Sequence, residues 1–306
     1  MKGTKVKFEP AFIEEAVFLN MKEKSGHADE PLTVSFHRER EKIYSGNLID
    51  QERDEAFQNL CEAYFAKIGL MAIFESIFSE FPLINRPDIL IFVKKVWRKK
   101  EEEAELYARG NLKTVAIGVQ ATNSLNRSSL EAFLRHEMMH ISDMLDPEFS
   151  YSPNPSLGGV NEMEDHLIRD RFRLLWDLYI DTRLRQRGLP TIISQEKQKV
   201  EFEKVFLFLE PERRNIIYQK ITNENQLNQS DLIEFALDKR FIKTFDQGGL
   251  ICPLCHFPSY DQIKGWSQET LWVAAEIKEN HPDWQPSLGV CLQCFEMYQS
   301  RLGIAK

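Results

Sequence analysis

The sequence predicts an α+β fold in which helices dominate, followed by a small module built around cysteines. Helical patterns of apolar residues far outnumber the segments that read as strands. Four of the five cysteines form two tight pairs near the C-terminus, after Gly248 and Gly249. We therefore expect two domains, residues 1–245 and residues 246–306.

The composition is typical of a soluble globular protein, with 42% hydrophobic and 28% charged residues in a chain of 306. The N-terminal segment lacks the apolar core and cleavage site of a signal peptide. No apolar run approaches the roughly 20 residues needed to cross a bilayer. We therefore expect a cytoplasmic protein without a membrane partner.

In the N-terminal part, three segments read as strands: residues 32–36, 89–93 and 114–119. The first alternates apolar and polar side chains, whereas the other two are apolar runs typical of buried strands. Residues 50–81 form one long helical pattern that ends before Pro82, and the charged stretch 98–109 also reads as a helix.

The next helix follows the last of these strands. Ser128 and Glu131 have the form of a capping box at its start. It should end near Asp146, because the residue before Pro147 is pushed out of helical dihedral angles. One side carries an apolar stripe: Leu130, Leu134, Met138, Ile141 and Leu145. We expect this stripe to anchor the helix and the opposite face to border a cleft.

This helix contains the sequence His136-Glu137-Met138-Met139-His140. At 100° per residue the two histidines lie about 40° apart, so both imidazoles project toward one metal ion. Glu137, between them, can reach a water molecule on that metal. Two surface histidines on an amphipathic helix are the simpler alternative, but the apolar back and a carboxylate-rich helix downstream favour a metal site.

Over residues 85–190 the chain resembles the zincin metallopeptidases, which are named for the HExxH motif. The resemblance implies a small mixed sheet with a cleft between strand and helix. It also implies that His136 and His140 bind a catalytic Zn²⁺ and that Glu137 is the general base. The implied reaction is hydrolysis of a protein or peptide substrate by a metal-activated water.

Catalytic zinc keeps three protein ligands, so one more is needed. Gluzincins carry ExxxD on the helix after HExxH, with the first carboxylate on zinc and the second supporting a ligand histidine. The matching residues here are Asp177 and Asp181, and the shorter Asp in place of Glu leaves open which of the two contacts zinc. We favour Asp181 as the ligand and Asp177 as its supporting residue, because the spacing from Trp176 to Asp181 is similar to that of other HExxH proteins with an Asp ligand. The metzincin pattern instead aligns Asp143 with its glycine and Asp146 with its third ligand. In that pattern the chain turns at the glycine with a positive φ, which Asp tolerates much less well than Gly.

Peptide hydrolysis also needs a hydrogen-bond donor for the oxyanion that develops on the substrate carbonyl. Three residues are candidates: Tyr151, His166 and Arg183. The sequence does not separate them.

The C-terminal cysteines form two CxxC pairs, Cys252 with Cys255 and Cys291 with Cys294. Each pair can present two thiolates to one tetrahedral zinc ion. The residues between the pairs include a helical pattern at 267–280, and the tail resembles zinc-ribbon modules with an inserted helix. Four thiolates leave no open coordination position, so we expect this Zn²⁺ to be structural. A redox pair is the alternative, and a single CxxC beside a βαβ unit would be typical of it.

These features predict a zinc-dependent peptidase with one catalytic and one structural Zn²⁺. The alternative is a non-catalytic zinc-binding protein with a regulatory or protein-interaction role. Nucleic acid is disfavoured as a partner, because the chain has a net charge of −8 and acidic residues outnumber Lys and Arg after residue 245. No feature of the sequence indicates an oligomeric state.

Overall fold

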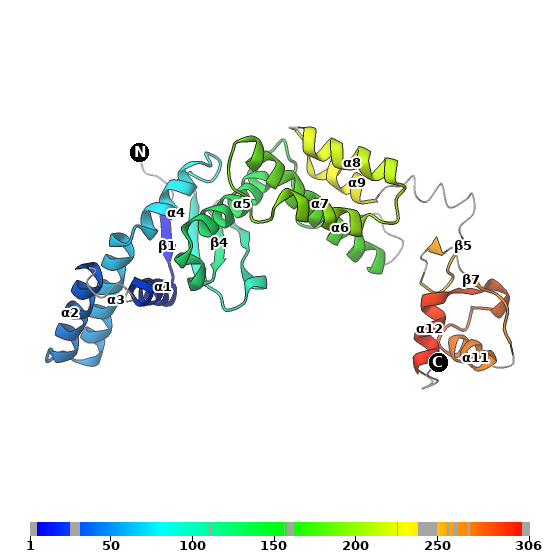
Figure 1. Cartoon of the computed structure of the whole chain (residues 1–306), viewed down its shortest axis with the longest axis horizontal. Coiled ribbons are helices and arrows are strands. Elements are labelled where there is room, and N and C mark those ends of the chain that lie inside the picture. Colours follow the sequence, from blue (N-terminus) through cyan, green and yellow to red (C-terminus); the bar gives the residue numbers. More distant parts are fainter. Residues whose placement is uncertain are drawn as a thin grey trace. The chain divides into compact units, whose positions relative to one another are not determined.

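The computed structural model of the chain describes residues 5–24, 31–110, 112–155, 157, 162–224, 226–237, 250–255, 258–259, 262–267 and 270–301. The chain separates into two compact units, Met1–Ala236 and Leu237–Lys306 (Figure 1). The boundary expected at residue 245 lies outside the described residues. Within the described part, no helix combines the length and the apolar character that a membrane span requires.

A four-stranded mixed sheet lies in the first unit, as the α+β prediction requires. Its order is β1-β2-β4-β3, formed by Lys5–Phe8, Ile89–Lys95, Leu112–Val119 and Ala104–Arg109. The pairs β1/β2 and β2/β4 are parallel, whereas β3 runs antiparallel to β4 at one edge. The strands predicted at residues 89–93 and 114–119 are confirmed as β2 and β4. Their inward side chains, among them Ile91 and Ile117, are fully buried.

Between β1 and β2 the chain forms four helices: α1 (Pro10–Lys24), α2 (Pro31–Ser45), α3 (Asp50–Lys67) and α4 (Leu70–Ser79). The strand predicted at residues 32–36 is wrong, because this segment opens α2 and buries Thr33 and Phe36 on one helical face. Alternation over five residues is too short to distinguish a strand from a helix. The single helix predicted over 50–81 is broken at Gly69, whose φ of 83° is left-handed.

The helix predicted over 98–109 is also wrong. A short 3-10 turn, η1 (Lys99–Glu101), is followed by strand β3 (Ala104–Arg109). An edge strand has one side open to solvent and commonly carries charged residues. Its composition therefore resembles that of a surface helix. Only pairing with β4 makes this segment a strand.

Helix α5 (Arg127–Leu145) carries both histidines. Its N-cap is Asn126, whose side chain accepts a hydrogen bond from the Ser129 backbone at 3.0 Å, so the capping box predicted at Ser128 is wrong. The predicted end is confirmed, because Asp146 has extended dihedral angles. Four residues of the predicted apolar stripe are fully buried: Leu130, Leu134, Met138 and Ile141.

The remaining helices of the first unit are α6 (Glu162–Gln186), α7 (Gln195–Val205), α8 (Pro211–Asn223) and α9 (Gln229–Leu237). Helix α6 packs against α5, α7 and α8. It therefore connects the histidine helix to the C-terminal helices of the unit.

The second unit is small. Strand β5 (Leu250–Ile251) pairs with β6 (Pro258–Ser259), and β7 (Gln262–Ile263) pairs with β8 (Val290–Cys291). Its helices are α11 (Leu271–Asn280) and α12 (Leu292–Arg301), with a 3-10 turn η4 at Pro286–Leu288. The helix predicted at 267–280 is thus confirmed in shorter form. Apolar side chains such as Ile277, Trp284 and Val290 pack around three buried cysteines.

Candidate metal centres

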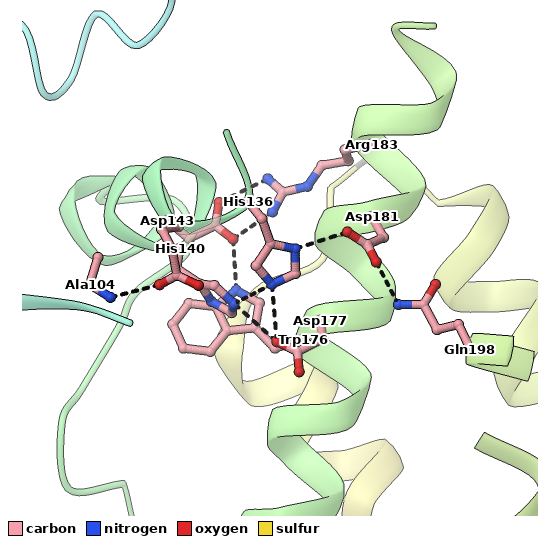
Figure 2. Close-up of polar contacts among 10 residues, drawn as sticks. Ala104, His136, His140, Asp143, Trp176, Asp177, Asp181, Arg183 and Gln198 are labelled. Atoms are coloured by element: carbon pink, nitrogen blue, oxygen red, sulfur yellow. Dashed lines mark hydrogen bonds and ion pairs between the residues drawn. The ribbon is translucent and has the colours of Figure 1, made fainter. Parts of the chain in front are cut away.

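Two helices bring three potential metal ligands together in the first unit. His136 and His140 stand one turn apart on α5, and Asp177 faces them from α6 (Figure 2). The Nε2 atoms of the two histidines are 3.3 Å apart. Oδ1 of Asp177 lies 3.0 Å from His140 Nε2 and 3.6 Å from His136 Nε2. One metal ion can contact all three atoms, and Asp177, half exposed, lies toward solvent.

Asp181 occupies a different position from the one we favoured. Its Oδ1 lies 2.9 Å from Nδ1 of His136, on the far side of the ring from the ligand cluster. Asp177 and Asp181 are four residues apart, about 6 Å along the helix axis, so one reaches Nε2 and the other Nδ1 of the same imidazole. The third potential ligand of the cluster is therefore Asp177, whereas Asp181 contacts His136 from behind. A carboxylate on Nδ1 fixes the tautomer that leaves Nε2 free to bind a metal.

Helix α7 contributes a residue that sequence reasoning missed. Gln198 donates from Nε2 to the second carboxylate oxygen of Asp181 at 3.0 Å. Arg185 in turn donates to Oε1 of Gln198 at 2.9 Å. Gln198 is only 4% exposed, although its neighbours on α7 are mostly charged. No local signal distinguishes it from the other glutamines of the chain, because its partner lies on another helix.

Glu137 contacts the edge of the sheet. The backbone N–H of Ala104, the first residue of β3, donates to its Oε2 at 2.7 Å. Within the described residues nothing else donates to this carboxylate. Burial raises the pKa of Glu137, and the positive charges of His140 and His136 oppose that effect. Ala104 therefore fixes one oxygen of Glu137 and leaves the other available.

A second buried network braces the other histidine. Asp143 accepts hydrogen bonds from Trp176 Nε1 at 2.8 Å and from Arg183 Nη1 at 2.8 Å. The indole ring of Trp176 packs edge-on against His140, with ring centroids 4.5 Å apart. Asp143 is thus linked to His140 through the ring of Trp176.

The metzincin alternative does not fit this structure. Helix α5 continues through Asp143, so no turn with positive φ occurs there. Asp146 caps the end of the helix and accepts a hydrogen bond from the Glu148 backbone. It does not join the ligand cluster of the described residues.

The three oxyanion-donor candidates lie in different surroundings. Arg183 is bound to Asp143, and His166 is exposed and contacts Arg169. Tyr151 packs against Trp176 with ring centroids 5.6 Å apart. Tyr151 is therefore linked to the histidine cluster through Trp176, whose ring contacts His140.

The charges of the cluster compensate one another. Burial by itself lowers the pKa of His136, but hydrogen bonds with Asp177 and Asp181 outweigh it and raise that pKa to about 10. Partial burial would raise the pKa of Asp177, whereas hydrogen bonds with His136 and His140 hold it well below its usual range. A metal ion bound here would have to replace a proton on imidazole, so we expect its binding to depend on pH.

The four tail cysteines converge in the second unit. The Sγ atoms of Cys252, Cys255, Cys291 and Cys294 all lie within 4.8 Å of one another. The backbone N–H groups of Cys291 and Cys294 donate to the sulfurs of Cys252 and Cys291 at 3.3 and 3.4 Å. Donation from Cys294 lowers the pKa of Cys252 to about 4, which favours a thiolate. The cluster can hold one metal ion.

The fifth cysteine is separate from both centres. Cys61 lies on α3 and is half-buried. Burial raises the pKa of its thiol to about 11, so it stays protonated at neutral pH.

Comparisons with protein-family models, with curated proteins and with solved structures found no match. Evidence for function therefore comes from the two clusters of potential ligands. One offers four sulfur ligands and the other offers two imidazoles and a carboxylate. Both are donor sets that bind divalent transition metals in proteins.

Proposed function

We propose that the chain is a zinc-dependent peptidase of zincin type, with Zn²⁺ on His136, His140 and Asp177 and with Glu137 as general base. The observation that carries this proposal is the triangle of ligand atoms beside the Glu137 carboxylate. A tetrahedral zinc ion with bonds of about 2.1 Å holds its ligand atoms about 3.4 Å apart. The three separations of 3.0, 3.3 and 3.6 Å agree with that spacing.

The donor set supports a catalytic rather than a structural role for this centre. Three protein ligands leave a fourth position open, as in catalytic zinc sites. A zinc ion bound there would supply Lewis acidity toward a substrate carbonyl and lower the pKa of a coordinated water. Asp181 holds His136 in the orientation that this requires.

Glu137 would move the proton. Ala104 holds its Oε2, so the other oxygen can accept a proton from the attacking water and deliver it to the departing amine. Because Ala104 begins an edge strand, its N–H points away from β4 and toward Glu137. An extended peptide could add to that edge and bring its backbone past the centre.

The four cysteines support a structural zinc ion. A tetrahedral zinc with Zn–S bonds of about 2.3 Å places its sulfurs about 3.8 Å apart. The sulfurs of Cys255 and Cys291 are 3.7 Å apart. We assign this unit to a zinc-ribbon type of module, stabilised by its metal.

The test compares the wild-type protein with Glu137→Gln, both loaded with zinc. We expect the wild type to cleave unstructured protein substrates and Glu137→Gln to lose at least about 100-fold in rate, because a general base contributes that much or more. Elemental analysis should find the same zinc content in both. Glu148→Gln, an exposed residue beyond the end of α5, is the matched control and should keep full activity.

Equal cleavage by the wild type and Glu137→Gln would contradict the proposal. Retention of zinc by a wild type that cleaves nothing would favour the non-catalytic alternative.

A further inference from the structure

A cavity of about 490 Å³ lies against Glu137. Its walls come from the connection between β2 and β3, from the 3-10 turn η2 (Ala121–Leu125), from the first turns of α5 and from the segment that follows α6. Because Glu137 lies on its wall, a substrate bound at the candidate centre would have a neighbouring side chain within reach of this cavity.

Glu102 supplies a fixed negative charge on the cavity wall. Its Oε1 accepts hydrogen bonds from the Gln120 backbone at 2.9 Å and from Asn123 Nδ2 at 3.3 Å. Its Oε2 accepts none from the described part of the chain. One oxygen thus holds the carboxylate in place while the other can receive a donor from a ligand. Glu102 is two residues before Ala104, roughly 7 Å along an extended chain, and Ala104 binds Glu137.

The cavity lining also includes one cationic residue, Lys99, but its charge is not held in place as the charge of Glu102 is. Lys99 is exposed and pairs with no carboxylate among the described residues. A long, solvated ammonium side chain loses conformational entropy when it is ordered, whereas Glu102 is already ordered by two hydrogen bonds. With Glu137 counted, the lining of the cavity contains two carboxylates and one exposed cation, Lys99.

The rest of the lining suits a side chain with an apolar stem. Ala132 and Phe133 are buried parts of the wall on α5, and Pro190 and Ile192 line it from the segment after α6. Gln120 and Asn123 add polar groups beside Glu102. Arginine and lysine combine a methylene stem with a cationic head, and a guanidinium can donate to several acceptors at once.

We propose that this cavity binds an arginine or lysine side chain of the substrate, adjoining the bond that is cut, and that Glu102 recognises the cation. The proposal rests on the peptidase function proposed above and names its substrate class. It makes Glu102 the residue that determines specificity.

The first test is cleavage-site mapping by mass spectrometry on a library of synthetic peptides with the zinc-loaded full-length protein. We expect Arg and Lys to be enriched at one position next to the cut bond. For a matched pair of peptides with Arg or Ala at that position, Glu102→Gln should lower the ratio of their kcat/KM values by about tenfold or more. Glu103→Gln removes a charge from the exposed neighbour, which does not line the cavity, and should leave the ratio unchanged.

Other cleavage results would overturn the inference and leave the peptidase function intact. One is cleavage without any preference for a basic side chain. Another is a preference for Asp or Glu that disappears in Lys99→Gln.

A binding measurement separates the two proposals. Fluorescence anisotropy with the same peptides in the Glu137→Gln background needs no turnover. Tighter binding of the Arg peptide, lost in Glu137→Gln/Glu102→Gln, would support the cavity assignment even if the wild type cleaved nothing. Equal binding of the Arg and Ala peptides to both proteins would overturn it.

Discussion

The two candidate metal centres are built in opposite ways. The four-cysteine centre takes its ligands from two short CxxC pairs, and backbone N–H groups of Cys291 and Cys294 support the sulfurs. The centre on α5 takes its ligands from two helices and depends on buried side chains of α6 and α7. A closed centre can be specified locally, whereas an open centre needs support from the rest of the unit to stay in place.

The two centres should also differ in how much the folding of their units depends on the metal. The second unit is small, and its apolar residues pack around the cysteines, so we expect metal binding and folding to be coupled there. In the first unit a sheet and several helices form an extensive apolar core, and His140 and Asp177 of the ligand cluster are only partly buried. We therefore expect the loss of metal to unfold the second unit and to leave the first unit folded.

The largest effect should come from the cysteine centre. Cys252→Ser should lose one zinc ion per chain and unfold the second unit, because structural zinc contributes on the order of 10 kcal/mol to folding of such modules. Elemental analysis and limited proteolysis after residue 237 measure the two effects. Cys61→Ser is the matched control and should keep both metals, since Cys61 does not belong to either ligand cluster of the described residues. A folded second unit in Cys252→Ser would remove the contrast between the centres.

The next effect concerns the third ligand. Asp177→Ala should weaken zinc binding at the α5 centre by more than about 100-fold, measured by competition with a chelator of known affinity. The second unit should keep its metal. Asp170→Ala, an exposed residue on the same helix, should leave both affinities unchanged. Normal affinity in Asp177→Ala together with loss in Asp181→Ala would restore the assignment that the sequence favoured.

A smaller effect should follow from the residues behind His136. Asp181→Asn should weaken zinc binding at the α5 centre by about 10 to 100-fold, and Gln198→Leu by less, because Gln198 reaches only one oxygen of Asp181. Isothermal titration with zinc in the Cys252→Ser background reports this centre alone. Lys197→Ala changes the exposed neighbour of Gln198 and should have no effect. If Gln198→Leu binds zinc as well as the wild type does, α7 is not part of the centre's support.

The smallest effect should be one of stability. Trp176→Phe keeps an aromatic ring beside His140 but removes the hydrogen bond to Asp143. It should lower the free energy of unfolding of the first unit by about 1–2 kcal/mol, since Arg183 still pairs with that carboxylate. Chemical denaturation measures it, and Trp97→Phe, on an exposed ring, should cost less than about 0.5 kcal/mol. A large loss of zinc affinity in Trp176→Phe would show that this network supports the metal more than the fold.

Much of both centres could be predicted from the sequence, and the reason is local geometry. A spacing of four residues on a helix places His136 and His140 on one face, and a CxxC pair brings two thiolates together wherever it occurs. The buried strands β2 and β4 and the end of α5 at Asp146 were predictable for the same reason, because apolar runs and a following proline act on adjacent residues.

The tertiary structure decided the contacts that depend on how helices and strands pack against one another. Asp177 and Asp181 lie on the same side of α6. The packing of α5 against α6 places Asp177 beside Nε2 of the histidines and Asp181 beside Nδ1 of His136. Residues 104–109 become a strand through pairing with β4, and the N–H of Ala104 then reaches Glu137. Gln198 and Glu102 acquire their partners from distant segments. Contacts between elements depend on packing of whole surfaces, and no spacing within one element specifies them.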